Sequence, residues 1–390
     1  MNLDALRRCF PALSRTHDGL PVAYFDGPGG TQVPRSVADA MTDYLFHHNA
    51  NTHWAYPTSE ETDAIIAAAR QAAGQFLHAT ADEISFGANM TTITFHLARA
   101  VARTWKAGDE VIVTELDHHA NVAPWRALEI DRGIVVRTAR MIPETCQIDM
   151  DHLARLTGPK TRLIAIGGAS NAVGTINDLA RVRQIARSAG ALFFVDAVHL
   201  APHARIDVRA LDCDFLAVSA YKFYGPHIGI LYARKALQES LPFPKLEPAP
   251  DTGPERVETG TQNQEGMAGV KATVEFMNSI DHHWLHQRGE KLTKMLWDGL
   301  QTIKGVRLFG PPPDAPRTPT VAFTVDGMTS EQVARALVKR AIFASHGDFY
   351  AATVIRVLGV EGLVRIGCAA YTTEEEVQRL LDAVTSASKA

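Results

Sequence analysis

The stretch FLAVSAYKFYGP, residues 215–226, shows most clearly how this chain is built. It begins with an apolar run that ends on Ser219, and a turn carrying Lys222 follows. Comparable apolar runs occupy 111–114, 163–167, 192–196 and 228–232, and helical patterns such as 91–105 and 179–188 lie between them. Near-continuous apolar strands that alternate with helices are typical of a mostly parallel sheet covered on both faces. The sequence therefore predicts an α/β fold.

Prolines mark the organisation of the rest of the chain. They crowd residues 242–254 and again 311–319, and a long helical pattern over 266–303 separates the two clusters. After the second cluster the patterns predict a strand at 320–325, a helix at 330–340 and a loop at 344–350. A strand at 362–367 and a helix at 374–384 follow. We therefore predict an N-terminal arm (1–22) that joins the small domain, a large α/β domain (23–255) and a smaller C-terminal α+β domain (256–390).

Composition excludes several classes of protein. The formal net charge is −4, and no basic stripe or Lys/Arg tract predicts a nucleic-acid or membrane partner. No apolar run approaches the roughly 18 residues of a membrane span, and residues 1–19 lack the apolar core of a signal peptide. The cysteines, which show no CxxC spacing, are Cys9, Cys146, Cys213 and Cys368. We expect a cytoplasmic protein with a small-molecule substrate, free thiols and no metal site.

Polar side chains follow four of the predicted strands. They are His118, Asn171, Asp196 with His199, and Ser219 with Tyr221 and Lys222. Taken singly, each could cap a helix or satisfy a loop, but the carboxyl ends of parallel strands meet at one edge, where ligands bind. A lysine amine can bind the aldehyde of pyridoxal 5′-phosphate (PLP), and a carboxylate can pair with its pyridinium nitrogen. The turn at 86–90 opens a helix with hydroxyls and suits the phosphate.

Several segments resemble the class V aminotransferase family, in its cysteine desulfurase/selenocysteine lyase branch. They are residues 24–26, 117–125, 170–175, 211–215 and 219–226. The spacing of Asp196 and Lys222, together with the Lys-x-Tyr-Gly-Pro signature, is specific to this resemblance, which extends from about Tyr24 to Leu381. The resemblance implies a PLP-dependent transferase fold of type I, like that of aspartate aminotransferase. It also implies a homodimer with shared active sites.

The resemblance implies a role for each matching residue. Lys222 would hold PLP as a Schiff base and move the substrate Cα proton, Asp196 would bind the pyridine nitrogen, and His118 would stack on the ring. The phosphate would contact the Met90 backbone, Thr91, Ser219, Tyr221 and, across a dimer interface, Thr261. Asn171 and His199 would lie near the phenolic oxygen. The substrate would contact Arg365, as the clamp for its carboxylate, with Asn51 and His346.

The chain departs from the family on the substrate side. A cysteine desulfurase needs a loop cysteine whose thiolate attacks the substrate sulfur and carries it as a persulfide, but loop 344–350 reads ASHGDFY. Cys368 is the nearest cysteine in sequence, and in a strand it would point to the face opposite Arg365. Further departures are Tyr221 in place of the usual His, Trp54 in place of Arg, and Gly27-Pro28-Gly29-Gly30 in place of Asn-Ala-Ala.

The leading hypothesis is therefore β-elimination from a sulfur- or selenium-containing L-amino acid, a C–S lyase reaction that needs no enzyme cysteine. Lys222 would act as the general base, and His346, Asp348 or Tyr350 would protonate the leaving group. The alternatives are cysteine desulfurase or selenocysteine lyase activity, and transamination or epimerisation as in other class V enzymes. The complete set of Lys222, Asp196, His118 and Arg365 argues against a PLP-fold protein without catalysis.

Overall fold

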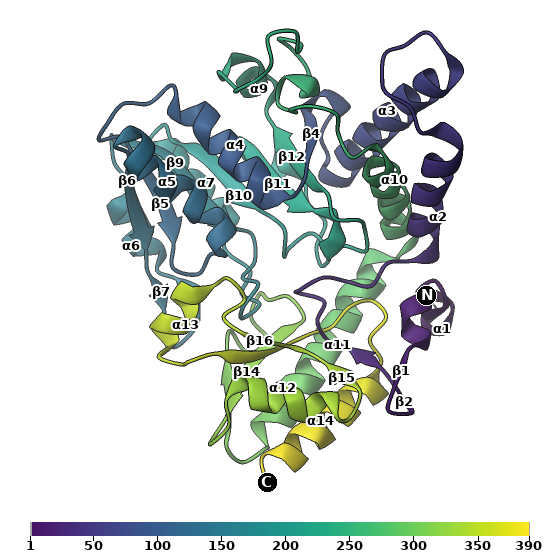
Figure 1. Cartoon of the computed structure of the whole chain (residues 1–390). Coiled ribbons are helices and arrows are strands. Elements are labelled where there is room, and N and C mark those ends of the chain that lie inside the picture. The colour runs from purple at the N-terminus through teal and green to yellow at the C-terminus, as the bar shows by residue number, and fades with distance from the viewer. Residues whose placement is uncertain (1, 390) are drawn as a thin grey trace.

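The computed structural model describes residues 2–389, which form a large and a small domain (Figure 1). Within them the large domain is built on a seven-stranded sheet in the order β4-β12-β11-β10-β9-β5-β6. The strands are β4 (Ile84–Gly87), β5 (Glu110–Thr114), β6 (Val135–Ala139), β9 (Thr161–Gly167), β10 (Leu192–Asp196), β11 (Phe215–Ser219) and β12 (Gly229–Ala233). The predicted α/β fold with a mostly parallel central sheet is confirmed.

Strand β12 runs antiparallel to both of its neighbours, β11 and β4. The connection explains this direction, because a parallel crossover needs about a dozen or more residues and only residues 220–228 join β11 to β12. Ser219 at the end of β11 therefore pairs with Gly229 at the start of β12. The turn between them, which carries Lys222, lies at the edge where the parallel strands end.

The sheet is covered on both faces because its strands send alternate residues to opposite sides. In β5, Val111 and Val113 join a core cluster with α4 and α5, whereas Ile112 joins the cluster that includes residues of α3, α6 and α7. The covering helices are α3 (Pro57–Leu77), α4 (Met90–Ala102), α5 (Ala123–Arg132), α6 (Met150–Leu156) and α7 (Leu179–Ser188). Burial on both sides accounts for the near-continuous apolar runs of the strands.

The helical pattern over 266–303 corresponds to two helices, α10 (Gln264–Ser279) and α11 (His282–Gln301). The chain breaks at Ile280, which is extended, and the Asp281 carboxylate then accepts hydrogen bonds from the first backbone N–H groups of α11. Helix α10 packs against α2 (Arg35–Asp43) and α3 of the large domain. We therefore move the proposed domain boundary from residue 256 to about Ile280.

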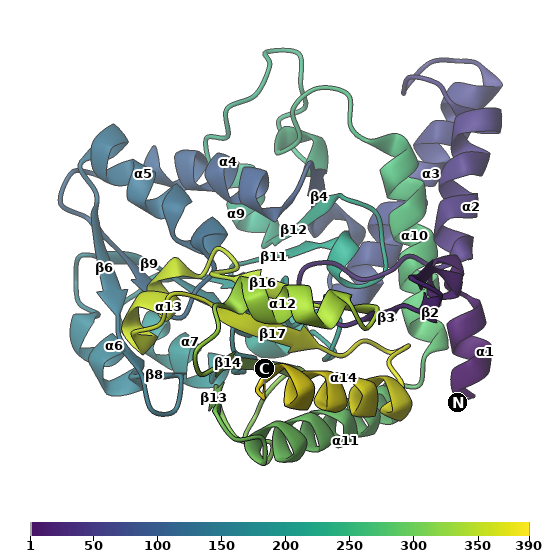
Figure 2. The ribbon, with the colours of Figure 1, turned by 60° about the horizontal axis from the view of Figure 1, so that its bottom comes forward.

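The small domain packs three helices against one face of a four-stranded antiparallel sheet, ordered β13-β14-β17-β16 within residues 2–389 (Figure 2). Its elements are α11, β13 (Val306–Phe309), β14 (Thr320–Val325), α12 (Ser330–Val338), β16 (Ser345–Gly347), α13 (Ala352–Leu358), β17 (Leu363–Gly367) and α14 (Glu374–Ala387). Part of the predicted loop 344–350 is thus strand β16. In β17, Val364 and Ile366 point into the helical core, and Leu363 joins the large core cluster. By strand alternation Arg365 shares the Leu363 face, toward the large domain.

The N-terminal arm contacts both domains. Helix α1 (Leu3–Arg8) joins the small domain through an ion pair between Arg7 and Glu376. Phe10 packs edge-on against Tyr224, Phe276 and Tyr371. Strand β3 (Ala23–Tyr24) then pairs with β15 (Ile342–Phe343) of the small domain. Among residues 2–389, no helix combines the length and apolar character needed to cross a bilayer.

Candidate active site

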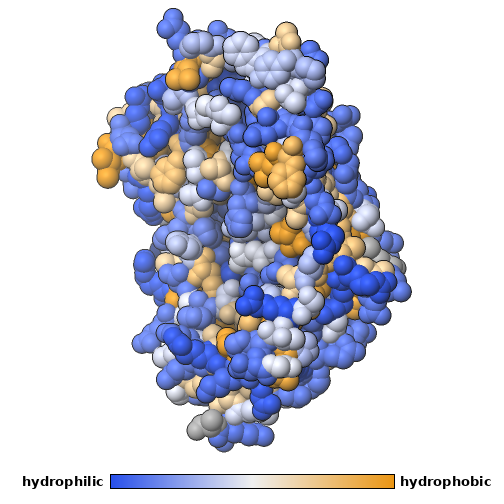
Figure 3. Space-filling model, turned by 45° about the vertical axis from the view of Figure 1, so that its right-hand side comes forward, coloured by the Kyte–Doolittle hydropathy of each residue, from blue (hydrophilic) through white to orange (hydrophobic). Residues whose placement is uncertain are grey.

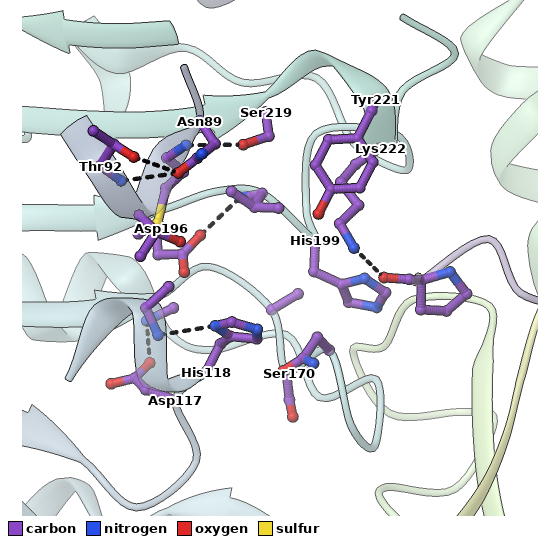
Figure 4. A pocket seen from close by; sticks show the side chains of 18 of the residues that line it. Asn89, Thr92, Asp117, His118, Ser170, Asp196, His199, Ser219, Tyr221 and Lys222 are labelled. Atoms are coloured by element: carbon purple, nitrogen blue, oxygen red, sulfur yellow. Dashed lines mark hydrogen bonds between the residues drawn. The ribbon is translucent and has the colours of Figure 1, made fainter. Parts of the chain in front are cut away.

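A cavity of about 880 Å³ opens at the carboxyl ends of the parallel strands (Figure 4). It is lined by residues from the ends of β5, β9, β10 and β11 and from the start of α4. Among the predicted site residues it brings together Met90, Thr91, His118, Asn171, Asp196, His199, Ser219, Tyr221 and Lys222. The convergence expected from the strand ends is therefore present in the folded chain.

The Lys222 amine projects into this cavity from the turn after β11. Its Nζ donates to the backbone oxygens of Pro28 at 2.5 Å and Gly29 at 3.0 Å. Burial, with a further contribution from the Arg365 charge, lowers the pKa of Lys222 to about 7. A substantial fraction of the amine is therefore neutral near pH 7, as a nucleophile or a general base requires.

Asp196 ends β10 and is only 7% exposed. Its Oδ1 accepts a hydrogen bond from the Val198 backbone N–H at 3.0 Å. Burial raises the pKa of Asp196 to about 6, although the Lys222 charge opposes the shift. A buried carboxylate with so few protein partners is suited to pair with a cationic ring nitrogen, which would restore its ionised form.

The His118 ring lies on another wall of the cavity and is neutral. Its Nδ1 accepts a hydrogen bond from the Ala120 backbone N–H at 2.9 Å, so the ring proton is on Nε2. Burial, assisted by the Lys222 charge, lowers the pKa of His118 to about 4. A flat ring without charge can stack on an aromatic cofactor without repelling a cationic pyridine nitrogen.

Asp117, a lining residue whose role the sequence reasoning missed, fixes the turn that carries His118. Its carboxylate accepts bonds from Thr114 N, Thr114 Oγ1 and Gly167 N at 3.1, 2.9 and 2.5 Å. Burial raises the pKa of Asp117 to about 7. The carboxylate thus ties the ends of β5 and β9 together. The buried Thr114-x-x-Asp117 spacing is the signal that could have indicated this role.

The first turn of α4 forms the end of the cavity that suits a phosphate. Asn89 caps the helix by accepting from Thr92 N, and Met90 N donates to Ser219 Oγ at 3.1 Å. Thr91 is exposed to the cavity. A Cβ on Gly229 would lie 2.5 Å from the Asn89 carbonyl carbon, so glycine permits β12 to approach this turn. Backbone N–H groups and hydroxyls at a helix N-terminus match the needs of an anion.

Arg365 reaches the site from the small domain and is 4% exposed. Its guanidinium donates to the Asn171 backbone oxygen at 2.8 Å and to Ser345 Oγ at 3.3 Å. The Phe349 ring covers it, with 4.1 Å between the guanidinium carbon and the ring centroid. Burial lowers the pKa of Arg365 to about 9, and the Asp26 charge opposes this shift. The guanidinium is therefore held in place from two sides before a substrate binds.

Asn171 and His199 each bridge the two domains. Asn171 Nδ2 donates to the Phe349 backbone oxygen at 2.9 Å, and its Oδ1 is buried without a partner within residues 2–389. His199 Nε2 lies 3.1 Å from both Thr318 Oγ1 and Thr320 Oγ1. An unpaired buried oxygen in a ligand-sized cavity is a place where a bound group would supply the missing donor.

Four predicted residues do not line this cavity, and one of them is Arg365, which lies beside it and contacts the lining residue Asn171. Thr261 lines a separate cavity of about 280 Å³, and its predicted action across a dimer interface stays a prediction. Asn51 is exposed in the loop before α3, where its oxygens contact Thr52 and Ser59. His346 pairs with Val364, on the opposite face of β16 from Ser345, so Ser345 and not His346 approaches Arg365. Strand alternation explains this difference.

The donor set fits PLP. It combines an amine, a buried carboxylate, a neutral flat ring, an unpaired amide oxygen and a helix N-terminus with hydroxyls around one cavity. The fold and this cavity define a PLP-dependent enzyme of fold type I.

Comparisons with known proteins agree with this class. Residues 23–380 match the model of the family "Aminotransferase class-V". A probable cysteine desulfurase of Vibrio cholerae is 30% identical over 99% of this chain and 98% of its own, and a cysteine desulfurase of Serratia proteamaculans is 31% identical over 97% and 96%.

Two solved structures are also similar. A cysteine desulfurase of Thermococcus onnurineus superposes with a TM-score of 0.93 at 27% identity, covering 99% of this chain and 98% of its own. A cysteine desulfurase of Escherichia coli gives a TM-score of 0.88 at 29% identity, with 100% and 99% covered. This chain belongs to the class-V aminotransferase family and is a PLP-dependent enzyme.

Proposed function

We propose that this enzyme is a C–S lyase that performs β-elimination on a sulfur- or selenium-containing L-amino acid. The similar proteins named above as cysteine desulfurases support a sulfur-containing substrate. The lyase outcome rests on one observation, the distribution of thiols in the folded chain.

The four cysteines lie away from the cavity. Cys9 is exposed on the N-terminal arm, and the other three are buried. Cys368 packs in the helical core of the small domain, where burial raises the pKa of its thiol to about 12, and burial raises the pKa of Cys213 to about 12 as well. A thiol with so high a pKa supplies almost no thiolate at neutral pH. The segment 345–350, which contacts the lining residues Asn171 and His118, contains no cysteine, and this favours a reaction without a persulfide on the enzyme.

Bound PLP would serve as an electron sink for the carbanion formed at the substrate Cα. Lys222, whose amine is partly neutral near pH 7, would take the Cα proton. Asp196 would keep the ring nitrogen protonated, and His118 would hold the ring plane. Arg365 would orient the substrate through its carboxylate, because a guanidinium fork can bind both carboxylate oxygens.

Tyr350 is the strongest of the three predicted donors to the leaving group. Its ring lies 5.7 Å from the His118 ring, centroid to centroid, and its side chain is 74% exposed. The Asp348 carboxylate already accepts from the Tyr350 backbone N–H, and His346 lies on the far face of β16. If Tyr350→Phe leaves the release of the thiol unchanged, this assignment fails.

We also propose that the enzyme acts as a homodimer. The segment that joins α2 to α3 exposes four large apolar side chains, namely Leu45, Phe46, Trp54 and Tyr56. The face shown in Figure 3 is mainly hydrophilic with separate apolar patches. Apolar patches of this kind favour burial against a partner. Light scattering of wild type and of Phe46→Glu would test this, with loss of the dimer expected for the variant.

The test of the lyase proposal compares the products formed from cysteine, cystine, cysteine conjugates and selenocysteine. We expect pyruvate and ammonia in equal amounts with a released thiol, sulfide or selenide, and we expect Cys368→Ser to match wild type. With a thiol reductant added to release enzyme-bound sulfur, alanine with sulfide, lost in Cys368→Ser, would instead establish a desulfurase. A pyridoxamine form of the cofactor would indicate a transaminase, and Cα proton exchange without elimination would indicate an epimerase. Lys222→Ala is the inactive control.

A further inference from the structure

His199 is held by two threonines of the other domain. It follows β10 of the large domain, whereas Thr318 and Thr320 stand just before and at the start of β14 in the small domain. Both Oγ1 atoms lie 3.1 Å from His199 Nε2. Both threonines are fully buried and His199 is 4% exposed, so water does not compete for these bonds. The small domain therefore determines how this ring is oriented.

The His199 ring is neutral. The charged or titratable groups that face it are His203, Arg365 and Lys222, and burial together with these neighbours holds the pKa of His199 well below its usual range. His203 packs edge-on against it with 5.6 Å between ring centroids, and burial lowers the pKa of His203 as well. A neutral imidazole carries one N–H, on either Nδ1 or Nε2.

The hydroxyl protons decide between these two tautomers. The Thr318 hydroxyl can donate either to Nε2 or to the Gly174 backbone oxygen, 3.4 Å away. The Thr320 hydroxyl has Nε2 as its one acceptor within residues 2–389. Since a buried hydroxyl donates its proton where an acceptor exists, Thr320 donates to Nε2. Nε2 must then be the unprotonated nitrogen, and the ring proton resides on Nδ1.

We propose that Thr320 is a positioning residue that fixes the Nδ1–H tautomer of His199 and so presents a hydrogen-bond donor to the phenolic oxygen of PLP. His199 lines the cavity, and no hydrogen bond reaches Nδ1 from residues 2–389, which leaves it available to a ligand. A donor at this place favours the deprotonated form of that oxygen. Thr318 supports the ring but does not determine the tautomer.

The inference rests on the expected contact between His199 and the phenolic oxygen and on the PLP class of the enzyme. It does not depend on whether the reaction is elimination, desulfuration or transamination. The experiment therefore measures the protonation state of His199 and the absorbance of the cofactor, and it needs no turnover of substrate.

The experiment compares Thr320→Val with Thr318→Val as the matched control, and with Thr320→Ser, which keeps the hydroxyl. In cofactor-free protein labelled with ¹⁵N-histidine, the His199 signals are assigned by their loss in His199→Asn. We expect the Nδ1–H pattern in wild type, Thr320→Ser and Thr318→Val, and an Nε2–H or mixed pattern in Thr320→Val. In PLP-loaded protein, the pH midpoint of the visible absorbance band should rise by roughly 0.5–1 unit in Thr320→Val alone.

The control variants make the result decisive. A wild-type nitrogen pattern in Thr320→Val would overturn the assignment of the tautomer. Equal shifts of the absorbance midpoint in Thr318→Val and Thr320→Val would also overturn the proposal, because they would indicate a general loosening of the site. Thermal unfolding of each variant identifies a loss of fold. If Thr320→Val does not fold, the wild-type spectrum still decides, because an Nε2–H pattern of His199 in wild type would overturn the proposal.

Discussion

The strand-end wall of the cavity and the small-domain residues beside the cavity are held in different ways. The strand-end wall is the part of the cavity lining that the large domain supplies. There Asp196 and Ser219 are the last residues of buried parallel strands, so the sheet fixes their positions. The small-domain wall, by which we mean Arg365 and residues 348–350, lies beside the cavity and not in its lining. Its segment 348–350 accepts hydrogen bonds from the large domain, from Asn171 Nδ2 to Phe349 O and from His119 N to Tyr350 O. Rigid strand ends suit the chemistry shared by a family, whereas a loop can change its residues without disturbing the core.

Backbone conformation reinforces this contrast. Phe349 and Tyr350 both adopt the left-handed region, each with φ of 56°. Non-glycine residues pay about 1–2 kcal/mol each for this conformation. The hydrogen bonds to Asn171 and His119 therefore help to hold this strained segment in place. We expect large effects on catalysis from the strand-end wall and smaller effects, mainly on substrate binding, from the small-domain wall.

The largest effect is expected on the strand-end wall. Lys222→Ala should lower kcat by about 10²–10⁴-fold, because the proposed general base is lost. It should also abolish covalent retention of PLP after gel filtration. Lys235→Ala, which changes an exposed lysine paired with Asp82, is the control and should retain full activity. Equal rates for Lys222→Ala and wild type would remove the distinction between the two walls.

Arg365→Lys tests the small-domain wall. The ammonium keeps the charge but loses the planar fork, so KM for the amino acid should rise by roughly 10–100-fold, with kcat changing less. Steady-state kinetics with one substrate separate these constants. A fall in kcat at constant KM would show that Arg365 acts on the chemical step and not on substrate binding.

The pH dependence of cofactor uptake links the two walls. Only the neutral form of an amine reacts with an aldehyde, and the pKa of Lys222, the proposed partner of PLP, is about 7. The rate of PLP uptake by cofactor-free protein should therefore rise about tenfold from pH 6 to pH 8 and then level off. Because the Arg365 charge contributes to the lowered pKa, Arg365→Leu should move the plateau to higher pH. An ordinary lysine would show no plateau below about pH 10.

The smallest effect is expected for Phe349→Leu. This change keeps an apolar side chain but removes the ring that covers the Arg365 guanidinium, a contact worth about 0.5–2 kcal/mol. We expect KM to rise by roughly 2–30-fold at nearly constant kcat. Phe343→Leu, at a ring that packs instead on His17 and Tyr24, should leave KM unchanged.

The residues of the strand-end wall could be predicted from the sequence, because they all follow from the positions at which the parallel strands end. Apolar runs locate the strands, and parallel strands bring His118, Asn171, Asp196 and Ser219 to one edge. The Cys368 position also follows from strand alternation, and the structure places Cys368 in the helical core behind β17.

The small-domain wall could not be predicted in the same way. The expected loop 344–350 contains strand β16, and its pairing with β17 decides that Ser345 rather than His346 approaches Arg365. That register depends on pairing between strands that are distant in the sequence, and it cannot be predicted from the local residue pattern of either strand. The contacts of Thr318 and Thr320 with His199 join residues more than a hundred positions apart, so they too require the folded chain.

The Lys222 amine is hydrogen-bonded to two carbonyl oxygens, those of Pro28 and Gly29. A buried amine left without acceptors would oppose folding, but these carbonyls satisfy it. These two main-chain oxygens therefore compete with any electrophile for the Lys222 amine, so the segment that carries them helps to set how readily the amine reacts.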